Sequence, residues 1–139
     1  MEDLKRQLCD VQGRLFELSL KSGYDSQRFV ELYMNSETVE YLDKPYDRMQ
    51  WAGEEYILEN LVEEAGEISV TGKKFPKEVM YWMGYIYRYW HFHTGESSRE
   101  IYKQADAQTM YETYLGFLIL DNAMAVENLK EIYEQKRKV

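Results

Sequence analysis

Two side chains near the middle of the chain have the types and the spacing to do chemistry. Arg88 and His93 form an Arg-x4-His pattern. A histidine can act as general acid and general base near neutral pH, and an arginine can hold a phosphate group through paired hydrogen bonds. The pair therefore permits an enzyme hypothesis.

The same segment, residues 77–93, is unusually rich in aromatic side chains. Large side chains occupy more than one face of the predicted helix, and such a helix usually lies between other elements. Tyr, Trp and Arg also dominate the energy of protein interfaces, so an exposed part of this surface would serve as a binding hot spot. The candidate partner-binding residues are Trp82, Tyr85, Arg88, Tyr89 and Trp90 on this helix, with Trp51 and Tyr56 from the preceding part of the chain.

Other reactive side chains lack the neighbouring residues that catalysis or metal binding would require. Cys9 is the only cysteine, so no intrachain disulfide and no Cys-based zinc site can form, and we expect a small packed residue. His91 and His93 are two positions apart and point in different directions on a helix. Acidic pairs such as Glu54-Glu55 come without a Glu-x-x-His motif and are expected on solvated helix faces. With no P-loop or dinucleotide-binding turn, we expect neither a metal nor a cofactor.

The net charge of −8 over 139 residues argues against binding nucleic acid, which requires a surplus of Lys and Arg on at least one face. A helix-turn-helix regulator ranks last, because residues 98–105 carry only Arg99 and Lys103 as basic groups. The longest uncharged apolar run, residues 114–120, is shorter than the ~20 residues of a membrane span. The polar N-terminus lacks a signal-peptide core. We therefore expect a cytoplasmic protein with no membrane contact.

The elements that must position these residues are predicted to be helices. Strong helix formers dominate, and apolar residues recur every three or four positions over 3–21. Further helices are predicted over 26–34, from 37 to Pro45, from Pro45 to about 65, over 77–93, and in the remaining chain. The segment 66–76 is predicted as a linker with a short extended piece at 68–70. It separates helical unit 1 (1–65) from helical unit 2 (77–139), packed as one globular domain.

The two units resemble each other in the positions of their glycines and helix-capping residues. Residues 22–29 align with 94–101, with a glycine and a helix-capping residue at matching positions, and the sequence of 58–61 aligns with 126–129. We predict an internal duplication, with two small helical units packed around the aromatic-rich helix. The alternative is coincidence, because helical hairpins share glycine caps for physical reasons.

Residues 23–63 carry three short motifs. They are Gly23 with Asp25 at a helix start, Tyr46-Asp47-Arg48-Met49, and Gly53 with Tyr56-Ile57. This stretch resembles a family of short, uncharacterised bacterial helical proteins that are often encoded beside ADP-ribosyltransferase-like toxins. The resemblance implies an antitoxin-like role and carries over no catalytic residue.

Two functions are therefore predicted. The first is a non-catalytic protein-binding module, antitoxin-like, that covers a partner's active surface with aromatic anchors and an acidic rim. The alternative is a small ribonuclease that uses Arg88 and His93, because this pattern resembles all-α ribonucleases of the HEPN type. Tyr89 departs from that family, in which the residue after the arginine is usually polar. A homodimer stays open under either hypothesis.

Overall fold

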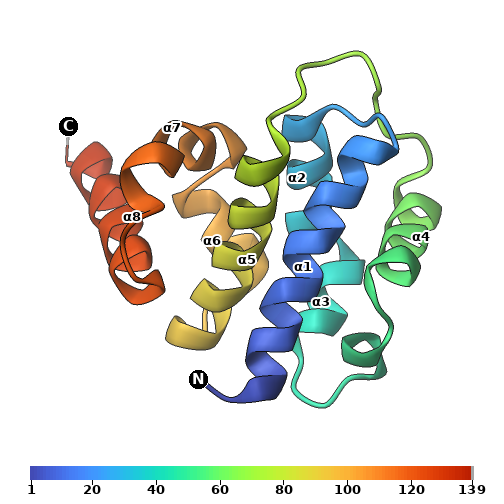
Figure 1. The fold of residues 1–139 in the computed structure, drawn as a ribbon, viewed down its shortest axis with the longest axis horizontal. Coiled ribbons are helices and arrows are strands. Elements are labelled where there is room, and N and C mark those ends of the chain that lie inside the picture. Colours follow the sequence, from blue (N-terminus) through green and yellow to red (C-terminus); the bar gives the residue numbers. More distant parts are fainter. Residues whose placement is uncertain (139) are drawn as a thin grey trace.

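The computed structural model describes residues 1–138, and within them the chain folds into eight α-helices and one short 3-10 helix with no strand (Figure 1). This confirms the predicted all-α class. In chain order the elements are α1 (Asp3–Lys21), α2 (Ser26–Met34), α3 (Glu37–Asp43), η1 (Arg48–Trp51), α4 (Glu54–Ala65), α5 (Lys77–Thr94), α6 (Ser98–Gln104), α7 (Ala107–Phe117) and α8 (Asn122–Arg137). None of these helices has the length and apolar character needed to cross a membrane.

The two longest helices of the first and second half, α1 and α5, lie side by side and run in opposite directions (Figure 1). Two glycines allow their close approach. A Cβ atom on Gly84 would lie 2.5 Å from the backbone oxygen of Gln12, and one on Gly13 would lie 2.7 Å from the Tyr81 ring. No larger residue fits at Gly84 unless the two backbones move apart, so these glycines set the distance between α1 and α5.

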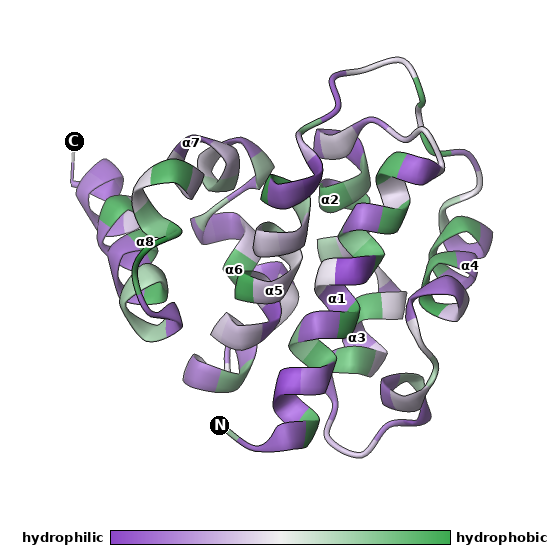
Figure 2. Ribbon diagram, viewed as in Figure 1, coloured by the Kyte–Doolittle hydropathy of each residue, from purple (hydrophilic) through white to green (hydrophobic). Residues whose placement is uncertain are grey.

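Aromatic side chains fill the space between α1, α2 and α5. The Phe16 ring makes edge-on contacts with Phe29 at 5.4 Å and with Tyr33 at 5.6 Å between ring centroids, and Tyr87 approaches from α5. All four side chains are buried. Full burial of one Phe contributes about 1.5–3 kcal/mol, so this cluster holds the three helices together. Figure 2 shows hydrophilic and apolar residues interleaved along the helices.

The predicted helix ends are confirmed where local chemistry decides them. The Asp25 side chain accepts a hydrogen bond from the backbone N–H of Arg28, and Ser97 forms the predicted capping box with Glu100. Gly95 ends α5 in the left-handed conformation, with φ of 78°. Such a conformation strains residues that carry a Cβ atom.

One local prediction is wrong. The helix predicted from Pro45 to about residue 65 is broken at Gly53, whose φ of 81° is incompatible with an α-helix, so η1 and α4 are separate. The segment 66–76 is a linker, as predicted, and contains no strand. It is nevertheless fixed, because the Asp25 N–H donates to the Ser69 carbonyl at 2.8 Å and the Ser26 N–H donates to the Lys73 carbonyl at 3.0 Å.

Candidate functional site

Arg88, the first candidate for chemistry, lies inside the protein. Its side chain is 2% exposed. It donates hydrogen bonds to the Asp43 carboxylate at 2.7 Å and to the Gln12 amide oxygen at 2.9 Å. Burial lowers the pKa of Arg88, but Tyr33 and the Asp43 carboxylate outweigh this effect and raise it, so the guanidinium stays charged. A phosphate or a protein partner cannot reach it in this fold.

The hydrogen bonds around Arg88 form a continuous network between helices. The Gln12 amide also donates to the Gly84 carbonyl at 2.8 Å, and its oxygen accepts the Tyr33 hydroxyl at 2.7 Å. The Ser98 hydroxyl donates to Asp43 at 2.8 Å. Side chains from α1, α2, α3, α5 and α6 therefore meet in one buried polar network, which positions these helices.

His93 points elsewhere. Its Nε2 atom lies 3.2 Å from the Glu127 carboxylate on α8, and its ring stacks on Tyr89 with 5.6 Å between centroids. The structure does not bring Arg88 and His93 together in an open cleft. The geometry therefore gives the ribonuclease hypothesis no support.

Trp90 is buried and serves a second polar cluster. Its Nε1 atom donates to the Glu96 carboxylate at 2.9 Å. Lys130 and Gln104 donate to the same carboxylate at 2.7 and 2.6 Å. Burial alone raises the pKa of Glu96, but these donors, with Thr94, outweigh it and hold the pKa at about 2. Trp90 therefore packs the C-terminal half together and has no exposed surface for a partner.

Cys9 is buried, as predicted. Desolvation raises the pKa of its thiol to about 12, although the charge of Arg88 acts in the opposite direction. The thiol is therefore protonated near neutral pH and is a packing group. Among the described residues, no cluster of three or more His, Cys, Asp or Glu side chains is placed to hold a metal ion.

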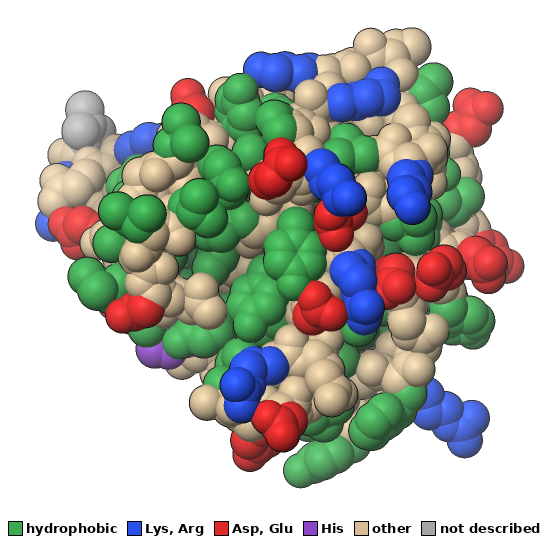
Figure 3. Space-filling view, in the orientation of Figure 1, with side chains coloured by type: hydrophobic (Ala, Val, Ile, Leu, Met, Phe, Trp, Pro, Cys, Tyr) green, Lys and Arg blue, Asp and Glu red, His purple; other side chains and the backbone are tan. Residues whose placement is uncertain are grey.

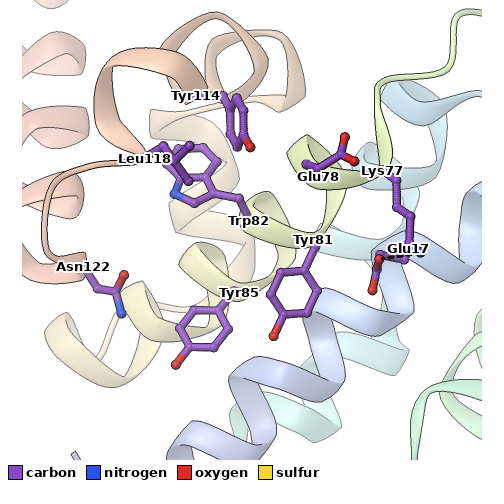
Figure 4. Close-up of a pocket in the computed structure, with 9 residues that line it drawn as sticks. All are labelled: Glu17, Lys77, Glu78, Tyr81, Trp82, Tyr85, Tyr114, Leu118 and Asn122. Carbon is purple, nitrogen blue, oxygen red and sulfur yellow. Dashed lines mark ion pairs between the residues drawn. The ribbon is translucent and has the colours of Figure 1, made fainter.

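Two of the remaining candidates on α5, Trp82 and Tyr85, line an open groove, and Tyr89 lies outside it (Figure 4). We call it the α5–α7 groove. Its volume of about 590 Å³ is in the range of ligand-binding clefts. The Trp82 side chain belongs to the core and is only 9% exposed, so it reaches the groove from below and packs edge-on against Tyr114, with 5.6 Å between centroids. The lining residues are Glu17, Lys77, Glu78, Tyr81, Trp82, Tyr85, Tyr114, Leu118 and Asn122.

Three tyrosines lie on one face of α5, and the first two line the groove. Tyr81, Tyr85 and Tyr89 are spaced four residues apart, which places them on the same side of a helix. Each is partly buried, and desolvation is the main cause that raises its pKa, so the hydroxyls stay neutral. The Tyr81 hydroxyl donates to the Asp10 carboxylate. The Tyr85 and Tyr89 hydroxyls form no hydrogen bond with any residue in 1–138, so both are free to bond a partner.

Apolar side chains beside the groove are exposed. Leu115 is 82% exposed and Ile119 is 86% exposed, and Leu118 and Met124 are also open to solvent. These four residues, at the end of α7, in the turn to α8 and on α8, form what we call the α7–α8 apolar patch. Figure 3 shows apolar atoms gathered on this side of the molecule. Single exposed apolar residues are ordinary, but a cluster beside an aromatic groove is typical of an interaction surface.

The patch was missed by the sequence-based selection of site residues. Its signal was the uncharged run 114–120. That run was considered only as a membrane span, for which it is too short. On a helix such a run is ordinarily buried, and only the placement of α7 and α8 leaves it open.

Trp51 and Tyr56 lie apart from the groove. Trp51, in η1, is 71% exposed, and Tyr56 on α4 is 52% exposed and lines a second pocket with Tyr41 and Tyr46. Helix α4 is on the opposite side of α1 from α7 (Figure 1). The predicted binding residues are thus divided between two surfaces and the interior.

Comparisons with protein-family models, with curated proteins and with solved structures find no match for the chain. The resemblance of residues 23–63 to antitoxin-like proteins stays a prediction. What the fold and the site define is an all-helical protein with a buried polar network and an exposed aromatic and apolar groove.

Proposed function

We propose that the chain is a non-catalytic protein-binding module that docks its partner on the α5–α7 groove and the α7–α8 apolar patch. The observation that carries this proposal is the exposure of Leu115, Leu118 and Ile119 beside an aromatic groove. Full burial of one large aliphatic side chain contributes about 1.5–3 kcal/mol, and the free chain lacks this contribution from the exposed leucine and isoleucine residues. A partner that covers them recovers this free energy.

The chemistry of the groove supports recognition of a protein surface. Trp82 and Tyr114 offer a rigid aromatic floor, and rigid aromatic anchors dominate interface energy. The free Tyr85 hydroxyl offers a hydrogen bond that orients the partner. Glu78 at one end of the groove has no ion pair within residues 1–138 and supplies an acidic rim. Binding here would cover the partner's own surface, which is how a stoichiometric inhibitor acts.

The test is a quantitative pull-down from the native cell lysate with three forms of the chain. Wild type is expected to recover a stoichiometric partner. Leu118→Asp places a charge in the apolar contact and is expected to lose most of that partner. Val70→Asp is the matched control, because Val70 is 55% exposed and Leu118 is 48% exposed, but Val70 lies in the 66–76 segment away from the groove. Equal recovery by all three forms, or recovery of the bait alone, would contradict the proposal.

The resemblance to proteins encoded beside toxins suggests what the partner does. We propose an antitoxin-like role in which the bound partner is an ADP-ribosyltransferase-like enzyme. Purified wild-type chain would then inhibit the enzyme at a one-to-one ratio, and the Leu118→Asp variant would not. An enzyme that remains active in the complex would rule out the inhibitory role but leave the binding role intact.

We also propose that the two halves arose by duplication around the aromatic helix α5. In support, α1 and α5 are the long first helices of each half, and each ends at a left-handed glycine, Gly23 or Gly95. A side-chain N-cap follows in both halves, from Asp25 and from Ser97. Related sequences in which the two halves align more closely would support this origin, and relatives that contain only one half would do so more strongly.

A further inference from the structure

We infer that the occupant of the α5–α7 groove is an amphipathic helix of the partner, with an apolar face and Lys or Arg residues on its flanks. This inference rests on the proposed protein-binding function and specifies the chemistry of what binds. Three features of the structure support it: the shape of the groove, the kind of backbone around it, and the charges at its rim.

The groove has the form of a missing helix position. Its floor is α5, one wall carries Glu17 of α1, and the other carries Tyr114, Leu118 and Asn122 of α7 and the start of α8 (Figure 4). Tyr81 and Tyr85 lie along the floor. The α5 residues that line the groove run from Lys77 to Tyr85, which at 1.5 Å per residue is about 12 Å, or roughly two turns of a bound helix. A helix packs in this way into the depression between two neighbouring helices.

The backbone around the groove excludes recognition of an extended strand. Added strands need an unpaired sheet edge, and residues 1–138 contain no strand. The floor and most of both walls are helical, with Leu118 in the turn between α7 and α8, and the helical backbone groups are bonded internally apart from the helix ends. Side chains alone must hold the occupant. Exposed aliphatic residues such as Leu115 and Ile119, in addition to the tyrosines, match the Leu- and Ile-rich face of an amphipathic helix.

Charge selects the flanks of that helix. Glu17 is paired with Lys77 at 3.7 Å, and Glu78 beside them has no ion pair within residues 1–138. The whole chain has a net charge of −8. Basic flanks would find complementary charge on this rim, whereas acidic flanks or an anionic membrane would be repelled.

The experiment is a display selection with a random 16-residue peptide library on immobilised full-length wild-type chain, with counter-selection on Leu118→Asp. Enriched peptides are expected to repeat apolar residues at i, i+3, i+4 and i+7 and to carry a net positive charge. Synthesised singly, they should bind wild type and Val70→Asp equally, and bind Leu118→Asp about tenfold or more weaker, as loss of an interface hot spot does. Glu78→Lys should also weaken them, and added salt should reduce that difference.

Other outcomes overturn the inference. Enriched peptides that are proline-rich, acidic or without helical periodicity would show that the groove binds a different class of segment. No enrichment over the counter-selected background would show that no isolated helix binds there. A dimer of wild type in analytical ultracentrifugation that Leu118→Asp dissociates would identify a second copy of the chain as the occupant. The pull-down described above decides the protein-binding function separately, because it does not depend on the shape or charge of the bound segment.

Discussion

The guanidinium of Arg88 bonds side chains from three other helices in the interior: Gln12 of α1, Asp43 of α3 and Ser98 of α6. The guanidinium forms an ion pair with the Asp43 carboxylate at 2.7 Å, and the Asp43 side chain is only 13% exposed. A buried ion pair adds little by itself, but removing one partner leaves the other charge buried and unpaired. The stability of the fold therefore depends on keeping both members of this pair.

We expect Asp43→Ala to lower the free energy of unfolding by about 3–5 kcal/mol, the cost of an unpaired buried charge. Urea denaturation followed by circular dichroism measures it. Glu40→Ala on the same helix is the control. Its exposed pair with Arg99, 3.4 Å apart, should contribute less than about 1 kcal/mol. A similar small loss for both variants would mean that Arg88 finds other compensation.

The Glu96 carboxylate makes the stability of the folded protein depend on pH in the acidic range. Its pKa is about 2 in the folded protein, below the ordinary value of 4.5, because Lys130, Trp90 and Gln104 donate to it against the effect of burial. A lowered folded pKa stabilises the protein above pH 4.5, and this contribution disappears as the pH falls from 4.5 to 2. We expect Glu96→Gln to be less stable than wild type at pH 7, with the difference shrinking toward pH 2. A difference that stays constant over this range, in thermal melts at several pH values, would contradict the account.

At the scale of the helices, the contact between α1 and α5 has no spare room. A Cβ atom at Gly84 would stand 2.5 Å from the Gln12 backbone oxygen, which a rotamer change cannot relieve. We expect Gly84→Ala to destabilise the protein by about 1–3 kcal/mol through overpacking. Gly116 in α7 is the matched control, because a Cβ atom there meets nothing within 4 Å. Gly116→Ala should be neutral or stabilising by up to about 1 kcal/mol, the usual gain in a helix. If Gly84→Ala were also neutral, the two helices would not be as close as described.

Several elements could be predicted from the sequence because their signals are local. The caps at Asp25 and Ser97 bond backbone groups three residues away, so short-range patterns locate the helix starts. The break at Gly53 was missed, because a glycine inside an amphipathic pattern does not reveal its φ angle. Local patterns thus predicted the class and most boundaries.

The candidate site was less predictable, because burial is decided by distant partners. Arg88 lies on a face with Tyr85 and looked like part of an interface. Its bonding partners Gln12 and Asp43 come from 76 and 45 residues away. Conversely, Leu115 and Ile119 have the composition of core residues and are exposed only through the placement of α7 and α8. Of the candidate partner-binding residues on α5, Trp82 and Tyr85 line the groove.

At the scale of the whole molecule, the two exposed aromatic surfaces lie on different sides of α1. The proposed function assigns binding to the α5–α7 groove and not to the surface around Trp51. We therefore expect Trp51→Ala to retain the partner in the pull-down while Leu118→Asp loses it. Trp51 and Leu118 are both large and exposed. Each variant therefore loses a large exposed side chain, and the two differ in which surface is changed. Partner loss with Trp51→Ala alone would move the binding site to η1 and α4.

The most direct test of the central claim is hydrogen–deuterium exchange of the chain alone and in complex with the partner recovered by the pull-down. We expect slower exchange on binding in peptides that cover 81–89 and 114–124, and unchanged exchange in peptides that cover 41–56. Protection of 41–56 without protection of the groove would contradict the account, and so would a complex that protects neither surface.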